Sequence, residues 1–142
     1  MKKYFSLVIL FGLFACCSSD SKRNVNPFLP EYSFSYPIIL TLPLFAPLTS
    51  NVNAMYINGQ GVGVKGIIVL RVSATDFRAW EAACPNQYPT DCSTMKIVGL
   101  EAKCDCDNLK YSLFTGVGTT EAQYTMKPYQ VEVNGGTVRV FN

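Results

Sequence analysis

Four cysteines in the second half of the chain are the residues best suited to chemistry: Cys84, Cys92, Cys104 and Cys106. Cysteine sulfurs bind iron and zinc, exchange with disulfides, or pair with one another. The sequence contains no histidine. This excludes a Ser–His–Asp or Cys–His catalytic unit, a histidine-ligated zinc or haem, and a histidine pH switch. Any metal site or reaction that involves these cysteines must therefore use sulfur ligands, alone or together with carboxylate or amide groups.

The start of the chain predicts export. A cationic Met-Lys-Lys precedes an apolar run over residues 4–15, which is too short to span a bilayer and has the pattern of a secretory signal. The run ends in Leu-Phe-Ala-Cys at residues 13–16, which resembles a bacterial lipobox. In lipoproteins of that kind the cysteine, here Cys16, receives lipid and becomes the mature N-terminus. An ordinary cleaved signal peptide with incidental cysteines is the alternative.

These features divide the chain into three segments. We expect a lipoprotein signal peptide over residues 1–15, a lipidated polar tether over residues 16–27, and one β domain over residues 28–142. The expected location is the cell envelope, with the protein anchored to a membrane by lipid and exposed to the periplasm or the cell surface. The expected partners are the membrane, through the lipid anchor, and an envelope protein of unknown identity.

Removal of the signal also changes the charge. Loss of the two N-terminal lysines leaves ten basic and ten acidic side chains, so the mature chain is neutral. No basic cluster of the kind that binds nucleic acid is present. The predicted oxidising compartment favours disulfides among the four domain cysteines.

The elements that position the cysteines have the pattern of β-strands. Residues 34–44 alternate between apolar and polar side chains, and Pro37 and Pro43 indicate a strand at a sheet edge. Residues 67–70 are apolar throughout, which is typical of a buried central strand, and residues 75–83 are its expected neighbour.

Shorter strands complete this pattern. Residues 55–58 precede a glycine-rich loop over 59–66, and strands over 100–103 and 110–114 flank a cysteine-bearing turn. Residues 129–140 contain Asn-Gly-Gly between two alternating runs, which predicts a hairpin. No helical period follows the signal. The sequence predicts an all-β sandwich or barrel of about eight to ten strands.

Two cysteine-bearing runs lie seventeen residues apart, Cys-Pro-Asn at residues 84–86 and Cys-Asp-Cys-Asp at residues 104–107. This arrangement resembles the Rieske family of [2Fe–2S] domains, whose pattern is Cys-x-His, a spacer of similar length, and Cys-x-x-His. Two loops there hold one cluster, with two cysteines on one iron and two histidines on the other. Tyr111 and Thr115-Gly116 occupy the family's aromatic and Thr-Gly positions. The resemblance implies a Rieske-like antiparallel β fold with two cysteine-bearing loops.

The departure from the family pattern falls on the metal ligands. Asn86 and Asp107 stand at the two histidine positions. An amide is a weak iron ligand, and a carboxylate is a hard one that favours oxidised iron. With only Cys84 and Cys104 as matching ligands, we expect these degenerate positions to hold no cofactor and no metal. The alternative is a [2Fe–2S] cluster in which Asn86 and Asp107 replace the histidines.

Four domain cysteines can pair in three ways. A Cys104–Cys106 bridge would close a strained ring across one residue, which argues against the pairing that contains it and leaves two others. In the Rieske fold the two ligand cysteines converge, and some members join their loops through the cysteine between the second loop's ligands. The resemblance therefore implies Cys84–Cys104 with Cys92–Cys106. The crossed pairing, Cys84–Cys106 with Cys92–Cys104, is the alternative.

Two classes of function follow. The first is a non-catalytic envelope lipoprotein, not an enzyme, whose Rieske-like domain has exchanged its cluster for disulfides and has no catalytic residues. The second is a Rieske-type electron-transfer protein with a cluster held partly by asparagine and aspartate. Thiol–disulfide exchange is a third use of the cysteines, which the flanking aspartates disfavour because they oppose a thiolate.

Overall fold

The computed structural model describes residues 26–119 and 121–142. The predicted signal peptide over residues 1–15, the lipidation site Cys16 and nearly all of the tether over 16–27 lie outside these residues. The described part is almost entirely β, with nine strands and one 3-10 helix: β1 (Ser35–Ile39), η1 (Pro43–Thr49), β2 (Asn53–Ile57), β3 (Ile67–Arg71), β4 (Phe77–Glu81), β5 (Lys96–Val98), β6 (Glu101–Lys103), β7 (Lys110–Ser112), β8 (Pro128–Asn134) and β9 (Thr137–Phe141). The all-β fold class expected from the sequence is confirmed.

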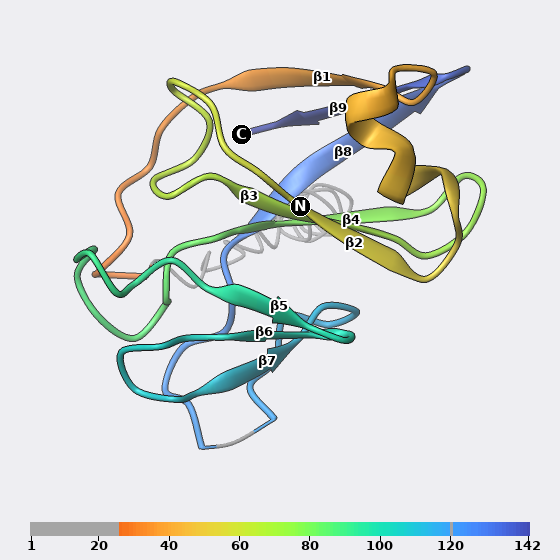
Figure 1. Ribbon diagram of the computed structural model, residues 1–142. Helices are drawn as coiled ribbons and strands as arrows, with labels where there is room; N and C mark the ends of the chain where they lie inside the picture. Colours follow the sequence, from red (N-terminus) through yellow and green to blue (C-terminus); the bar gives the residue numbers. More distant parts are fainter. Residues whose placement is uncertain (1–25, 120) are drawn as a thin grey trace, which may run out of the picture.

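The strands form two antiparallel sheets. A six-stranded sheet has the order β1-β9-β8-β4-β3-β2, and a three-stranded sheet has the order β5-β6-β7. Figure 1 shows the six-stranded sheet curling around the upper half of the molecule, with the smaller sheet below it. The smaller sheet carries the cysteine-bearing turns at one of its ends. The larger sheet packs against this smaller sheet and supports it.

Strand β3 is buried on both faces because it separates two apolar cores. Ile67 and Val69 face the first core, whereas Ile68 and Leu70 face the second. All four side chains are fully buried. This confirms the central position that the unbroken apolar run predicts.

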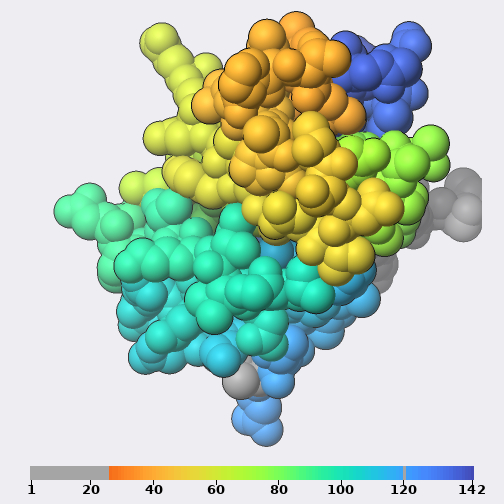
Figure 2. All heavy atoms as spheres, turned by 45° about the vertical axis from the view of Figure 1, so that its right-hand side comes forward, coloured from red at the N-terminus to blue at the C-terminus, as the bar shows by residue number. Residues whose placement is uncertain are grey.

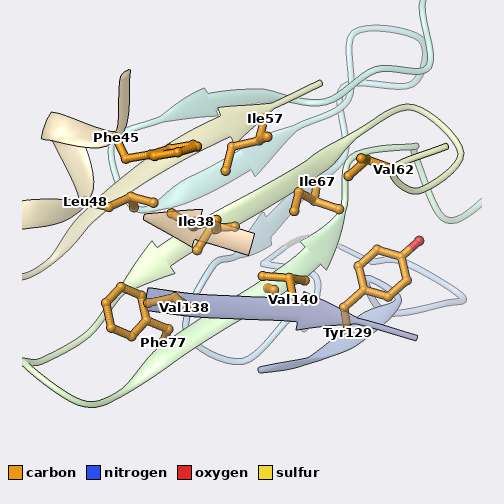
Figure 3. Packing of buried hydrophobic residues seen from close by; sticks show 12 residues of the cluster. Ile38, Phe45, Leu48, Ile57, Val62, Ile67, Phe77, Tyr129, Val138 and Val140 are labelled. Carbon is orange, nitrogen blue, oxygen red and sulfur yellow. The ribbon is translucent and has the colours of Figure 1, made fainter. Parts of the chain in front are cut away.

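The first core lies inside the curl of the six-stranded sheet. Side chains from β1, β2, β3, β4, β8, β9 and η1 meet there, and Figure 3 shows them pointing toward one another. Phe34 packs edge-on against Tyr129, with ring centroids 4.8 Å apart. Burial of this apolar surface is the main term that holds the larger sheet closed.

The second core lies between β3–β4 and the smaller sheet. It contains Trp80, Ala102, Tyr111 and Leu113 together with the sulfurs of two cysteines. The Trp80 indole N–H donates to the Leu113 carbonyl at 2.8 Å, so the one polar atom of that side chain is satisfied inside the core. In Figure 2 residues near 40–57 and 95–103 form one continuous surface, in agreement with the contacts between β2 and β5.

The N-terminal strand is shorter than the sequence predicts. β1 ends at Ile39, and the alternation that continued to residue 44 does not continue the strand. A 3-10 helix follows, in which Phe45 and Leu48 are buried at a spacing of three residues. Pro43 begins this helix, since it has no N–H for a sheet ladder and its fixed φ suits a helical first turn. The prediction of a strand through residue 44, without any helix after the signal, is therefore wrong.

Other predicted strands agree better with the structure. β1 lies at the edge of its sheet, as Pro37 indicates. β8 and β9 form the predicted hairpin, with Asn134 opposite Thr137 and Gly135 at φ 58° in the turn. β5 is an additional strand of only three residues that no sequence pattern marked. In the described part of the chain, no helix is long and apolar enough to cross a membrane.

Candidate functional site

Two loops at one end of the smaller sheet carry the four domain cysteines. Loop 1, defined here as residues 82–95, joins β4 to β5, and loop 2, residues 104–109, joins β6 to β7. Loop 1 is closed by the Met95 N–H, which donates to the Ala82 carbonyl at 2.7 Å. The Cys104 N–H closes loop 2 by donating to the Leu109 carbonyl at 2.9 Å. Both loops are thus fixed at their bases by backbone hydrogen bonds.

Two disulfides join these loops. Cys84 pairs with Cys104 and Cys92 pairs with Cys106, with Cα–Cα distances of 5.6 Å and 5.3 Å. This is the pairing that the Rieske resemblance implies, and the crossed alternative is absent from the structure. We call Cys84–Cys104 the inner bridge, because both residues are fully buried in the second core. Cys92–Cys106 is the outer bridge, in which Cys92 is exposed and Cys106 half-buried.

The side chain of Asn86 is fully engaged in hydrogen bonds. Its amide nitrogen donates to the Tyr111 hydroxyl at 2.7 Å and to the Tyr124 carbonyl at 3.1 Å. Its oxygen accepts from the Tyr124 N–H at 2.8 Å. Asn86 therefore ties loop 1 to β7 and to the segment before β8. This residue, which the sequence resemblance aligns with a histidine, is thus a structural link between these segments.

Asp107, the other histidine-equivalent residue, lies on the surface of loop 2. It is exposed, and one carboxylate oxygen accepts from the Leu109 N–H at 2.9 Å. Such a bond two residues along the chain is an Asx turn, which shapes the loop locally. The structure thus gives Asp107 a role in the turn of loop 2.

The degenerate positions do not fit a [2Fe–2S] cluster in this arrangement. The two sulfurs that would bind one iron are bonded to each other, and the Asn86 oxygen is occupied by a backbone N–H. Cluster sulfurs must be free thiolates, and a ligand oxygen must have a lone pair directed at the metal. The sulfurs of Cys84, Cys104 and Cys106 do lie within 4.8 Å of one another, but all three are in disulfides.

Tyr111 lies at the centre of the contacts between the loops. It is fully buried in the second core, and only its hydroxyl meets a polar partner, Asn86. Burial raises the pKa of the Tyr111 hydroxyl to about 12, because the phenolate is poorly solvated there, while the Asn86 hydrogen bond acts in the opposite direction. The phenol therefore stays neutral and serves as a hydrogen-bond partner.

The backbone geometry at residue 116 explains why a glycine follows Thr115. Gly116 has φ 71°, and a Cβ there would lie 2.5 Å from the Trp80 ring. Its N–H donates to the Ser112 carbonyl at 2.7 Å, and its carbonyl accepts from the Met126 N–H at 2.8 Å. Glycine at this position lets the backbone pass against the indole face.

Among the described residues, Glu81 is the most buried charged residue, and the sequence analysis did not single it out. Its carboxylate accepts from the N–H groups of Val64 at 2.6 Å, Lys65 at 2.9 Å and Ala83 at 2.9 Å. The Tyr129 hydroxyl donates to the same carboxylate at 2.6 Å. The glycine-rich loop over residues 59–66 thus binds a carboxylate of its own chain through backbone amides. The sequence pattern of β4 does not indicate that Glu81 is buried, because a charged residue at the end of a strand is ordinarily expected to face solvent.

The chain was compared with protein families, curated proteins and solved structures. No protein-family model and no curated protein matches the chain. Among solved structures, it is similar to the ferredoxin of carbazole 1,9a-dioxygenase from Nocardioides aromaticivorans IC177, at 15% identity and a TM-score of 0.48 over 78% of this chain and 97% of that chain.

Two further solved structures are similar to the chain at comparable levels. A chain in the complex of reduced oxygenase and oxidized ferredoxin in carbazole 1,9a-dioxygenase is 23% identical, with a TM-score of 0.46 over 64% of this chain and 82% of that chain. A protein assigned as the small subunit of an NADH-dependent nitrite reductase from Mycobacterium tuberculosis is 10% identical, with a TM-score of 0.47 over 79% and 97%. At these identities the likeness concerns the course of the backbone and not the ligands.

Proposed function

We propose that this protein is a non-catalytic lipoprotein of the cell envelope, whose Rieske-like domain has lost its iron–sulfur cluster and is held by two disulfides. The observation that carries this proposal is the use of the cluster positions for other bonds. The inner bridge consumes both cysteine ligands, and Asn86 is committed to Tyr111 and Tyr124. Function depends on the site more than on the fold, so the loss of the ligands removes the ground for electron transfer.

The proposed anchor is compatible with the position of the described N-terminus. Asn26 donates to the Pro85 carbonyl in loop 1 at 2.7 Å, so the tether joins the domain beside the disulfides. Asn26 lies ten positions after Cys16 in the sequence. An extended chain of that length spans at most about 36 Å. A lipid on Cys16 would therefore hold loop 1 within about that distance of the membrane surface.

Iron and sulfide analysis tests the loss of the cluster. The full chain is produced and purified anaerobically, and its iron, acid-labile sulfide and electron paramagnetic resonance spectrum are measured. We expect colourless, iron-free protein without a spectrum after dithionite reduction. Stoichiometric iron and sulfide with a reduced-cluster spectrum would overturn the proposal in favour of an electron carrier that uses Asn86 and Asp107.

Metabolic labelling tests the anchor separately. Cells that express the full chain are grown with labelled palmitate, and the Cys16→Ser variant is compared with Cys17→Ser. We expect the label and the membrane fraction to be lost only in Cys16→Ser, because a lipobox directs modification to a single cysteine. Unlabelled wild-type protein in the soluble envelope fraction would contradict the lipoprotein assignment.

A further inference from the structure

The two disulfides differ sharply in their access to solvent. Cys84 and Cys104 are each 0% exposed, so an external thiol cannot reach the inner bridge in the folded protein. Cys92 is exposed in loop 1, and it forms the outer bridge with Cys106. Thiol–disulfide exchange requires direct approach of the attacking sulfur. A reductant must therefore attack the outer bridge first, and Cys92 is its more exposed sulfur-bearing residue.

Cys106 connects the two bridges in space. Its sulfur lies within 4.8 Å of the sulfurs of both Cys84 and Cys104, although it is bonded to neither. Cys92 is not part of this group of three. When the outer bridge opens, the sulfur of Cys106 is thus already close to both sulfurs of the inner bridge.

A hydroxyl group and an ion pair beside the outer bridge partly offset the effect of the flanking aspartates on a thiolate there. The Thr90 hydroxyl lies 3.5 Å from the Cys92 sulfur and 3.6 Å from the Cys106 sulfur, so it can donate to either after reduction. The carboxylate of Asp105, which precedes Cys106, is paired with Lys96 at 2.5 Å. This ion pair lowers the repulsion that the aspartate would otherwise exert on a neighbouring thiolate.

We propose that reduction of the outer bridge is followed by an internal exchange that moves the inner disulfide from Cys84–Cys104 to Cys84–Cys106. An external dithiol attacks the Cys92 sulfur, releases Cys106 as a thiolate, and leaves as its own disulfide, having supplied two electrons. The Cys106 thiolate then attacks the Cys84 sulfur. The Cys84–Cys104 bond breaks, and Cys104 leaves as a thiolate that takes up a proton.

Attack on Cys84 is favoured over attack on Cys104. A Cys104–Cys106 bond would close a ring across a single residue, which strains the disulfide. The product of the exchange has Cys92 and Cys104 reduced, so the effect of a surface reductant reaches a sulfur inside the second core. This activity is stoichiometric, and it goes beyond the proposed scaffold function.

Limited reduction of the full chain tests the exchange. The protein is treated with one equivalent of a dithiol, unfolded in acid at successive times, and alkylated with N-ethylmaleimide. After alkylation the remaining disulfide, which joins the two cysteine-bearing peptides, is reduced and its thiols are blocked with iodoacetamide. Trypsin then separates peptide 79–96, with Cys84 and Cys92, from peptide 104–110, with Cys104 and Cys106. Fragmentation then assigns the label within each peptide. We expect label on Cys92 and, increasingly with time, on Cys104; label confined to Cys92 and Cys106 at all times would overturn the proposal.

Two matched variants isolate the role of Cys106. Cys92→Ser and Cys106→Ser each remove the outer bridge and leave one free thiol. In Cys92→Ser we expect label on Cys104 without any reductant, at a level at least about ten-fold above that in Cys106→Ser, where only Cys92 reacts. Equal labelling of Cys104 in the two variants would contradict the relay. Should either variant fail to fold, the wild-type time course decides alone.

Discussion

At the scale of single residues, the polar side chains inside this molecule act as links between segments. The Glu81 carboxylate joins the glycine-rich loop, β4 and β8 through four hydrogen bonds. The Asn86 amide joins loop 1 to Tyr111 and Tyr124. Among the described residues, no buried side-chain nitrogen or oxygen lacks a partner. Such satisfied groups fix one arrangement of the chain, because each alternative leaves a buried group unpaired.

Replacing Glu81 with glutamine should destabilise the fold strongly. The side chain keeps its shape, but its amide N–H₂ would face backbone N–H groups that require an acceptor. We expect the free energy of unfolding to fall by about 2–4 kcal/mol, measured by urea denaturation. Glu132→Gln is the matched control: its ion pair with Arg139 is exposed, so a loss below about 1 kcal/mol is expected. Equal losses in the two variants would refute a special role for Glu81.

The stability should also fall at high pH because of Tyr111. The pKa of this residue is raised by burial to about 12 from a model-compound value of 10.0. Between these values the unfolded chain loses the phenolic proton while the folded chain keeps it, so the unfolded state binds fewer protons and stability decreases as pH rises. A shift of this size corresponds to about 3 kcal/mol.

The Tyr111→Phe variant separates this effect from other groups. The pKa of Tyr129 is also raised, because it is buried beside Glu81, so the wild-type protein carries more than one such contribution. We expect the variant to lose stability at neutral pH, since Asn86 loses a partner, but to show a shallower fall toward pH 12 in urea denaturation. Parallel pH profiles for the two proteins would show that Tyr111 titrates normally.

At the scale of elements, turns decide how closely the smaller sheet packs on β4. Gly116 follows β7, and its backbone lies against the ring of Trp80, the single tryptophan of the chain. Gly99 lies in the turn between β5 and β6 and also has a positive φ, 63°, but nothing lies within 4 Å of a Cβ built there. The two glycines thus share a conformation and differ in their surroundings.

This pair allows backbone strain to be separated from packing. We expect Gly99→Ala to cost about 1 kcal/mol, the price of a left-handed conformation with a Cβ. Gly116→Ala should cost about 2 kcal/mol more, because its Cβ would also displace the indole. Tryptophan fluorescence should shift in Gly116→Ala alone. An unchanged emission spectrum together with equal losses of stability would contradict the packing argument.

At the scale of the whole molecule, two cores share the strands β3 and β4. The first core closes the six-stranded sheet, and the second attaches the smaller sheet to it. The smaller sheet has three strands of three residues each, which cannot persist without support. Its attachment therefore depends on the second core and on the disulfides, which close loops with sequence separations of 20 and 14 residues.

Complete reduction should loosen this half of the molecule selectively. In the chain-entropy model each bridge contributes about 3 kcal/mol, and both bridges lie beside the smaller sheet. We expect amide hydrogen exchange in β5–β7 to accelerate by at least about a hundred-fold on reduction, while amides in β3 and β9 change little. The protein with intact disulfides is the control. Uniform acceleration across both sheets would indicate instead that the two cores unfold together.

Much of the fold could be predicted because its signals are local. The apolar run of β3, the alternation of β8 and β9 and the glycines of their turn each mark an element within a few residues. The helix η1 was missed because its apolar residues first follow a period of two, and only the position of the core shows that Phe45 and Leu48 are the buried ones. β5 was missed because three residues carry too little pattern.

The candidate site also combines features that the sequence predicts with features that only the tertiary structure shows. The types and spacing of Cys84, Asn86, Cys104 and Asp107 were enough to identify a degenerate cluster motif and, through the family resemblance, to suggest the disulfide pairing. The tertiary structure alone decided that Asn86 bonds across 25 and 38 residues to Tyr111 and Tyr124. It alone placed Glu81 against amides 16 and 17 residues away and brought the Cys106 sulfur beside the inner bridge. A sequence records which groups are available, but hydrogen bonds and sulfur contacts between distant segments exist only once packing has fixed their distances.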